Sequence, residues 1–133
     1  MTYEERIHWL RRYRQSLRNE NLLRERINTA QERATSISQA LSPIASHSGL
    51  YDKMAECLER IDQYQMDLAA QILRSEAIRE EIDAAIDTLN DTQRAVLYER
   101  YILGKSVVEI SNSQHLCARR IYQIHRKAIL ELL

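Results

Sequence analysis

Apolar residues recur at helical spacing over two long segments of the chain. In each segment they follow one another mostly at steps of three and four residues, or at multiples of seven, which places them along one side of a helix. We therefore expect helices over about residues 3–41 and 51–88, and the spacing of Thr2 and Glu5 predicts a capping box at the first start. The apolar positions are Ile7, Leu10, Leu17, Leu23, Ile27, Ala30, Ala34, Ile37 and Leu41, then Met54, Leu58, Ile61, Leu68, Ile72, Ile82, Ile86 and Leu89.

The residues between these helices, Ser42 to Leu50, include Pro43 and Gly49 and predict a connection. Neither helix can bury its stripe alone, and a short connection favours an antiparallel, coiled-coil-like hairpin. Gln65 and Ser75 interrupt the second stripe, so we expect an imperfect seam that leaves a face open to a partner chain.

The last part of the chain, residues 89–133, predicts three shorter helices. Asn90 or Asp91 is expected to cap the first of them near Thr92, and Gly104 supplies the left-handed residue that commonly ends a helix. This helix carries the apolar residues Ala95, Val96, Leu97, Tyr101 and Ile102.

The other two helices form a helix-turn-helix pattern. Ser106 and Glu109 have capping-box spacing and open a short helix through Ile110 and Ser111. A turn is expected near Asn112 to Leu116, and a basic last helix starts at Cys117 or Ala118, with Ile121, Ile124 and Ala128 facing inward. The fold class predicted is all-α, with a hairpin over residues 1–88 and a three-helix unit over residues 89–133.

Composition and charge refine this picture. Only two glycines and one proline occur in 133 residues, as an all-α chain requires. The formal net charge is zero, but residues 1–50 and 88–133 each carry a balance of +3 and residues 51–87 carry −6. A basic C-terminal part can bind a polyanion although the total charge is neutral, because salt screens the interaction between charges that lie more than about 8 to 10 Å apart.

Several classes of protein are disfavoured. No apolar run approaches the roughly 20 residues that cross a bilayer, and the N-terminus is charged, so we expect a soluble, cytoplasmic protein. Cys57 and Cys117 are interpreted as reduced packing residues. His115, His125 and Cys117 lack the ligand spacing of a zinc finger, and no catalytic motif occurs. We expect no metal, no cofactor and no enzymatic activity.

The segment "LNDTQRAVLYERYILGKSVVEISNSQHLCARRIYQIHRKAIL" resembles region 4 of bacterial sigma factors. The whole chain is similar in layout to small sigma-like phage and prophage proteins, and more distantly to phage late-gene transcription regulators. The resemblance implies a helix-turn-helix that binds promoter DNA, with RNA polymerase as a partner. The matching residues, without a gap, are Val96, Leu97, Arg100, Tyr101, Gly104, Ser106, Glu109, Ile110, Leu116, Arg120, Ile121, Gln123, Ile124 and Ala128.

The chain departs from the region 4 pattern around its turn. The family usually has Ala at Ser111, an apolar residue at Ser113, Gly at His115, and Ser or Thr at Cys117. Cysteine caps a helix poorly and His115 would need a left-handed backbone, so we expect a looser or shifted turn.

Helical periodicity predicts which residues of the last helix face DNA. With Ile121, Ile124 and Ala128 inward, the expected base contacts lie on the opposite side, where Arg suits guanine and Gln suits adenine. They are Ala118, Arg119, Tyr122, Gln123 and Arg126, with Arg119, Gln123 and Arg126 contributing most. The expected phosphate contacts are Lys105, Ser106, Arg120 and Lys127.

These observations predict a DNA-binding transcription regulator or sigma-like factor, encoded by a phage or prophage, that uses its last helix in the major groove. The hairpin would mediate self-association or contact RNA polymerase. Because the chain shows no segment that resembles other sigma regions, we expect an accessory regulator. Two alternatives remain open at this point, namely a phage DNA-packaging or recombination accessory protein and a helical scaffold without DNA binding.

Overall fold

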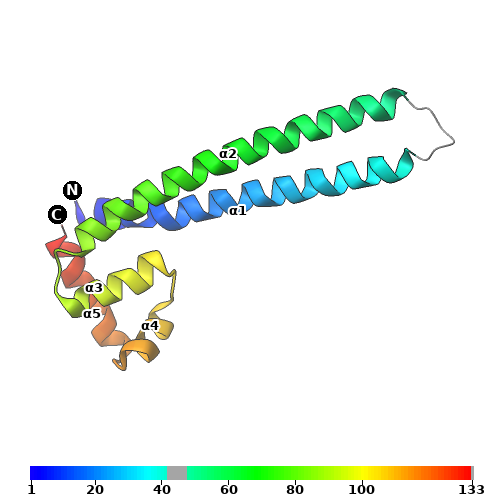
Figure 1. Cartoon of the computed structure of the whole chain (residues 1–133). Helices are drawn as coiled ribbons and strands as arrows, with labels where there is room; N and C mark the ends of the chain where they lie inside the picture. The colour runs from blue at the N-terminus through cyan, green and yellow to red at the C-terminus, as the bar shows by residue number, and fades with distance from the viewer. Residues whose placement is uncertain (42–47, 133) are drawn as a thin grey trace. The chain divides into compact units, whose positions relative to one another are not determined.

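The computed structural model describes residues 1–41 and 48–132, and within them every regular element is helical. In chain order these elements are α1 (Tyr3–Ala40), α2 (Ser48–Ile86), α3 (Asp91–Leu97), the π-helical turn η1 (Tyr98–Ile102), α4 (Val107–Gln114) and α5 (Ala118–Glu131). The all-α fold predicted from the sequence is confirmed, with a long helical pair followed by a C-terminal helical unit (Figure 1).

A capping box marks the start of α1, and α2 begins earlier than expected. The backbone N–H of Thr2 donates to Glu5 Oε2 (2.7 Å) and that of Glu5 donates to Thr2 Oγ1 (3.2 Å), which confirms the capping box of α1. The expected connection, Ser42 to Leu50, falls mostly on residues 42–47, which lie outside the described residues. Its last three residues already belong to α2, so this helix begins at Ser48 rather than at residue 51.

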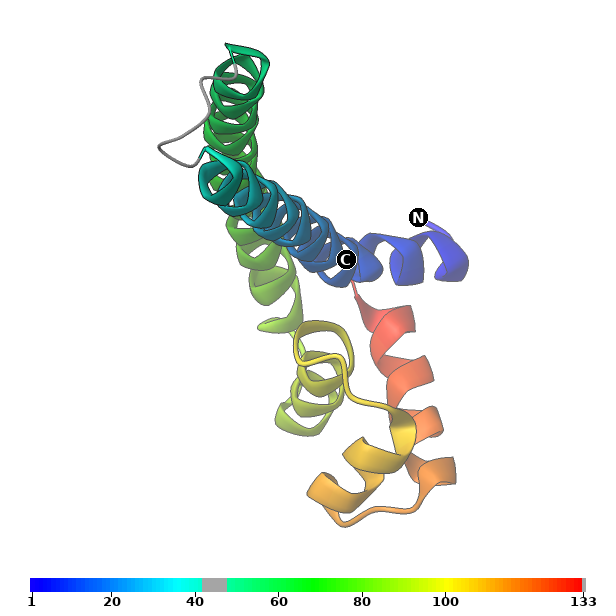
Figure 2. The ribbon, with the colours of Figure 1, turned by 90° about the vertical axis from the view of Figure 1, so that its right-hand side faces the viewer.

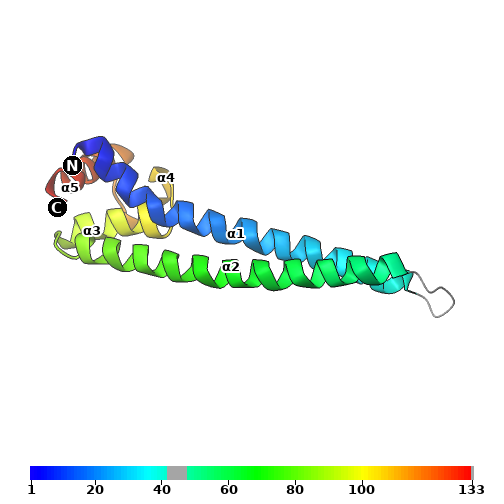
Figure 3. The same cartoon turned by 90° about the horizontal axis from the view of Figure 1, so that it is seen from above.

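The chain forms two compact units. One consists of Arg18–Leu73 and contains the facing parts of α1 and α2, which run antiparallel (Figure 3). Apart from the half-buried Asp67, its buried and half-buried positions on α2 alternate at steps of four and three residues, which is the repeat of a coiled-coil seam. These positions are Leu50, Met54, Cys57, Ile61, Tyr64, Leu68 and Gln71.

Two residues assigned to the apolar stripe of α2 therefore do not lie in the seam. Leu58 is 52% exposed and Ile72 is 36% exposed, and Cys57 and Gln71 are buried in their place. Gln65 is exposed and does not interrupt the seam, which corrects the prediction made for it.

The other unit consists of Met1–Leu17 and Arg74–Leu133. Its core joins Leu10 of α1 and Ile82 of α2 with Leu97 of α3, Tyr101 of η1 and Ile129 of α5, all buried. Ser75 is also buried in this unit, where its Oγ lies 2.6 Å from Ser16 Oγ, so the polar residue that interrupts the stripe is satisfied across the helical pair. The division of the sequence at residue 88 stays a prediction.

The first turns of α1 also hold the end of α5 within this unit (Figure 2). Arg6 Nη1 donates to the carbonyl oxygens of Ile129 (2.9 Å) and Leu130 (2.7 Å). The last carbonyls of a helix lack partners within the helix, so the guanidinium completes the C-terminal end of α5.

Candidate nucleic-acid interface

The three C-terminal helices are defined by local caps. Asn90 Oδ1 accepts from the backbone N–H of Gln93 (2.9 Å), while Gln93 Oε1 accepts from that of Asn90 (3.4 Å), so α3 begins with a capping box at Asn90. Ser106 and Glu109 form the same reciprocal pair at the start of α4, both contacts at 3.2 Å, as the sequence predicts. Gly104 has a left-handed backbone with φ 71°, which confirms its role after the preceding helical segment.

The turn between α4 and α5 is shorter than expected. Helix α4 continues to Gln114, three residues beyond Ser111, because His115 adopts the left-handed conformation (φ 55°, ψ 38°) that ends a helix. The expectation of a left-handed His115 is thus confirmed. Cys117 occupies the N-cap position of α5 and makes no side-chain capping bond, as its residue type predicts.

Ser111 and Ser113, which depart from the region 4 pattern, both fasten this turn. Ser111 Oγ donates to the carbonyl oxygen of Leu116, which ties the last part of α4 to the start of the turn. Ser113 Oγ lies 2.6 Å from Glu99 Oε1 and 3.1 Å from the carbonyl oxygen of Ile110, and its single proton favours the charged and nearer acceptor.

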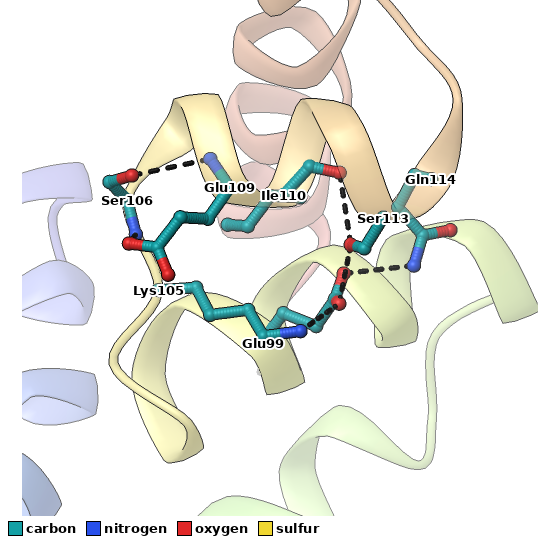
Figure 4. Close-up of polar contacts among 7 residues, drawn as sticks. All are labelled: Glu99, Lys105, Ser106, Glu109, Ile110, Ser113 and Gln114. Carbon is teal, nitrogen blue, oxygen red and sulfur yellow. Dashed lines mark hydrogen bonds and ion pairs between the residues drawn. The ribbon is translucent and has the colours of Figure 1, made fainter.

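Glu99 is the centre of this polar cluster and was not selected by the sequence analysis (Figure 4). Besides Ser113, it accepts from Lys105 Nζ (2.9 Å) and from Gln114 Nε2 (2.8 Å). Burial raises the pKa of Glu99, but the hydrogen bonds from Ser113, Lys105 and Gln114 outweigh burial and leave that pKa below its ordinary value. The carboxylate is therefore charged at neutral pH, and it holds the C-terminal end of α4 and Lys105, the residue before the N-cap of α4, against η1.

The π-helical turn places Glu99 in this position. In η1 the N–H of Leu103 donates to the carbonyl of Tyr98 (3.1 Å), five residues earlier, where an α-helix would use four. Residues Glu99, Tyr101 and Ile102 of this turn are all buried. The apolar spacing of Val96, Leu97, Tyr101 and Ile102 predicts an ordinary helix here, and this expectation is corrected.

Helix α5 is anchored by the residues that its periodicity selects. Ile121 and Ile124 are 1% and 5% exposed and pack with Val96 and Ile110, while Ala128 is fully buried in the neighbouring core. The inward placement of these three side chains is confirmed. The opposite side of α5 is open in this chain: every residue predicted to contact bases is exposed, namely Ala118, Arg119, Tyr122, Gln123 and Arg126.

Contacts of the candidate base-reading residues are few. The Arg126 guanidinium lies 5.8 Å from the ring centre of Tyr3, a cation–π distance, so the first turn of α1 borders the exposed face of α5. Arg120 Nη1 lies 3.5 Å from Gln123 Oε1, the upper limit of a hydrogen bond. Arg119 and Gln123 are both exposed on α5.

The residues predicted to contact phosphate fall into two groups. Arg120 and Lys127 are exposed and border a shallow groove with Gln123 and the first residues of α3. Lys105 and Ser106 are half-buried and make internal contacts, Lys105 with Glu99 and Ser106 in its capping box. The structure thus brings Arg120 and Lys127 together on α5, and it gives Lys105 and Ser106 a defined role in positioning α4.

Among the described residues, no three His, Cys, Asp or Glu side chains gather as a metal site requires. No helix within residues 1–41 and 48–132 has the length and apolarity needed to span a bilayer.

Comparison with known proteins identifies the C-terminal helices. Residues 85–132 match the family model of Sigma-70, region 4, which supports a sigma-70 region 4-type helix-turn-helix in this part of the chain. Sigma-70 region 4 is a DNA-binding regulatory domain rather than a catalytic one, and such domains bind DNA and RNA polymerase. The match therefore indicates a DNA-binding transcription regulator or sigma-like factor. Neither the curated proteins nor the solved structures contain a match to the chain.

Proposed function

We propose that the protein is a sequence-specific regulator of transcription that inserts α5 into the major groove of promoter DNA. The observation that carries this proposal is the division of α5 into a buried side at Ile121 and Ile124 and an exposed side with Arg119, Gln123 and Arg126. Arginine and glutamine at these positions suit bidentate contacts to guanine and adenine.

The flanks of α5 support a defined register on the duplex. Arg120 and Lys127 lie on the side of α5 that borders the groove with the first residues of α3, where they would contact phosphates. Tyr122 and Ala118 lie on the exposed side and would contact bases in part. Lys105 and Ser106 would contact a phosphate at the start of α4. Lys105 would then bind Glu99 and the phosphate at the same time.

Selection of sites from random duplexes, at several salt concentrations, tests the proposal. A recovered consensus and a log–log salt slope on the order of −4 to −5, for about four to six phosphate contacts, support sequence-specific regulation. Binding without a consensus would favour a packaging or recombination accessory protein. Absence of salt-sensitive binding, or binding unchanged when Arg119 and Arg126 are both replaced by Ala, would favour a scaffold.

The proposal includes a homodimer formed through the hairpin. Tyr51, Leu58 and Ile72 are exposed apolar residues of α2 separated by multiples of seven, so they share one side of the helix outside the seam. The −6 balance of residues 51–87 complements the +3 balance of residues 1–50, which favours α2 of one copy beside α1 of a second copy. Helix-turn-helix dimers bind paired half-sites, so the selected consensus would be two-fold symmetric.

The mass in solution tests the dimer separately. Leu58→Glu should give a monomer, whereas Leu103→Glu, the same change at an exposed leucine outside the stripe, should leave the dimer intact. A monomeric wild-type chain at micromolar concentration would refute self-association through this face. Contact with RNA polymerase and a phage or prophage origin complete the proposal, supported by the region 4 match and by the layout of a hairpin before it.

A further inference from the structure

A cavity of about 190 Å³ lies beside α5, on the flank opposite the groove that Arg120 and Lys127 border. All the residues that line it belong to the unit of Met1–Leu17 and Arg74–Leu133. Cavities of about 150 Å³ with apolar walls hold a benzene-sized molecule, so this space admits a single small ring.

The floor of the cavity is apolar. Val96, Ile110 and Ile121 form it, each at most 1% exposed, and the half-buried Ile7 and Val107 stand at its sides. A ring seated on these side chains would remove apolar surface from water, at about 25 cal/mol for each Å². The floor therefore favours an aromatic or aliphatic body in the ligand.

The rim is positively charged. Arg11 of α1 and Arg100 of η1 line the cavity, and none of its lining residues is acidic. Among the described residues, no ion pair joins either guanidinium to a carboxylate. Arg100 Nη1 donates to the carbonyl oxygen of Lys105 (3.1 Å), which fixes the guanidinium without neutralising it.

His125 and Tyr101 stay neutral beside these charges. Burial, and then the charges of Arg100 and Arg11, lower the pKa of His125, while burial raises the pKa of Tyr101 to about 12. His125 Nε2 and the Tyr101 hydroxyl lie 2.7 Å apart in a hydrogen bond. The lining therefore carries a net positive charge at neutral pH, which an anion would balance.

We infer that this cavity binds a small organic anion that has one aromatic or apolar ring and one carboxylate. The ring occupies the floor of Val96, Ile110 and Ile121, and the carboxylate meets the guanidiniums of Arg11 and Arg100 at the rim. The inference rests on the cavity and its charges, and it holds whether or not α5 binds DNA.

Calorimetric titration of the full chain without DNA tests the inference, with benzoate as the probe and benzamide as its neutral counterpart. Benzoate should bind at least about ten-fold more tightly than benzamide, since hydrogen bonds between charged partners are roughly twice as strong as those with a neutral partner. Arg11→Gln should remove most of this difference while leaving benzamide binding unchanged. Arg11 is exposed, so this variant should fold, and Arg119→Gln on the open side of α5 is the matched control.

Proton resonances of the His125 ring locate the bound probe. Benzoate should shift them while leaving those of the exposed His8 and His115 in place. Val107→Phe, which fills the cavity from its side, should abolish binding of both probes. Equal affinity for benzoate and benzamide, benzoate binding unaffected by Arg11→Gln, or an unshifted His125 would each overturn the inference.

Discussion

Ser113 Oγ donates to Glu99 Oε1 at 2.6 Å, across fourteen residues of sequence, and this bond joins the C-terminal half of α4 to the π-helical turn. The family pattern has an apolar residue at the serine position. In this chain the serine satisfies a buried carboxylate instead, and Lys105 and Gln114 complete the same group. The departure from the pattern is therefore part of a polar cluster that fixes the helix-turn-helix.

Ser113→Ala should lower the free energy of unfolding by about 1 to 2 kcal/mol, because Glu99 stays buried and loses a donor. Denaturant unfolding measures the change. Asn112→Ala, at the exposed neighbouring position, is the control and should stay within about 0.5 kcal/mol of wild type. Equal stability of the two variants would show that Ser113 does not hold α4.

Gly104→Ala and Gly49→Ala should have opposite effects. Gly104 has φ 71°, and an added Cβ would lie 2.6 Å from Arg14 Cζ, so alanine there should cost about 1 to 2 kcal/mol. Gly49 lies near the start of α2 with nothing within 4 Å of a Cβ, so alanine there should be neutral or stabilise by up to about 1 kcal/mol. Thermal unfolding of both variants measures the contrast, and a Gly104→Ala protein as stable as wild type would contradict it.

Much of this part of the chain could be predicted because its signals are local. The capping box of Ser106 and Glu109, the left-handed Gly104 and the inward Ile121 follow from residue type and spacing, and the left-handed His115 follows from the glycine that the region 4 pattern has at its position. The length of α4 was missed because the sequence does not show whether the helix or the turn holds residues 112–114. His115 decides this in the structure by taking the C-cap.

Two features could not be predicted because they depend on packing. The π-helical turn that buries Glu99 needs the donors of α4 opposite it, and nothing at Glu99 itself indicates this. In α2 both Cys57 and Leu58 lie three or four residues from Met54 and from Ile61, so helical spacing fits either of them. Leu58 was chosen because it is the more hydrophobic residue, whereas Cys57 occupies the seam.

Cys117→Ser should stabilise the protein by about 0.5 to 1 kcal/mol. Cys117 has the extended backbone of an N-cap (φ −70°, ψ 157°) but makes no side-chain cap, and a hydroxyl could accept from a free N–H in the first turn of α5. The same substitution at the buried Cys57 is the control and should destabilise, since it places a hydroxyl in an apolar seam. A Cys117→Ser variant less stable than wild type would show that the turn cannot form the added bond.

Acidification below about pH 6.5 should weaken the fold through His125. Its pKa is lowered by burial and by Arg100 and Arg11, so the unfolded chain binds the proton more readily than the folded chain. This destabilisation of the folded state is absent above the pKa of about 6.5 that histidine has in the unfolded chain, and it grows as the pH falls toward the lower pKa of the folded chain. Unfolding free energies at pH 7.5 and 5.5 should differ less in His125→Gln than in wild type. Replacing the exposed His8 by Gln should leave the pH dependence unchanged.

Arg119→Ala and Lys127→Ala should affect DNA binding in different ways if α5 reads the major groove. Loss of a base contact at Arg119 should cost about 1 to 3 kcal/mol and relax the selected consensus at one position. Loss of a phosphate contact at Lys127 should weaken binding to all sequences alike and reduce the salt slope by about 1. Arg33→Ala, which removes the same charge from an exposed position on α1, should change neither measure. If Arg119→Ala behaved as Lys127→Ala does, both residues would contact only the backbone, and sequence would have to be read by other residues of α5.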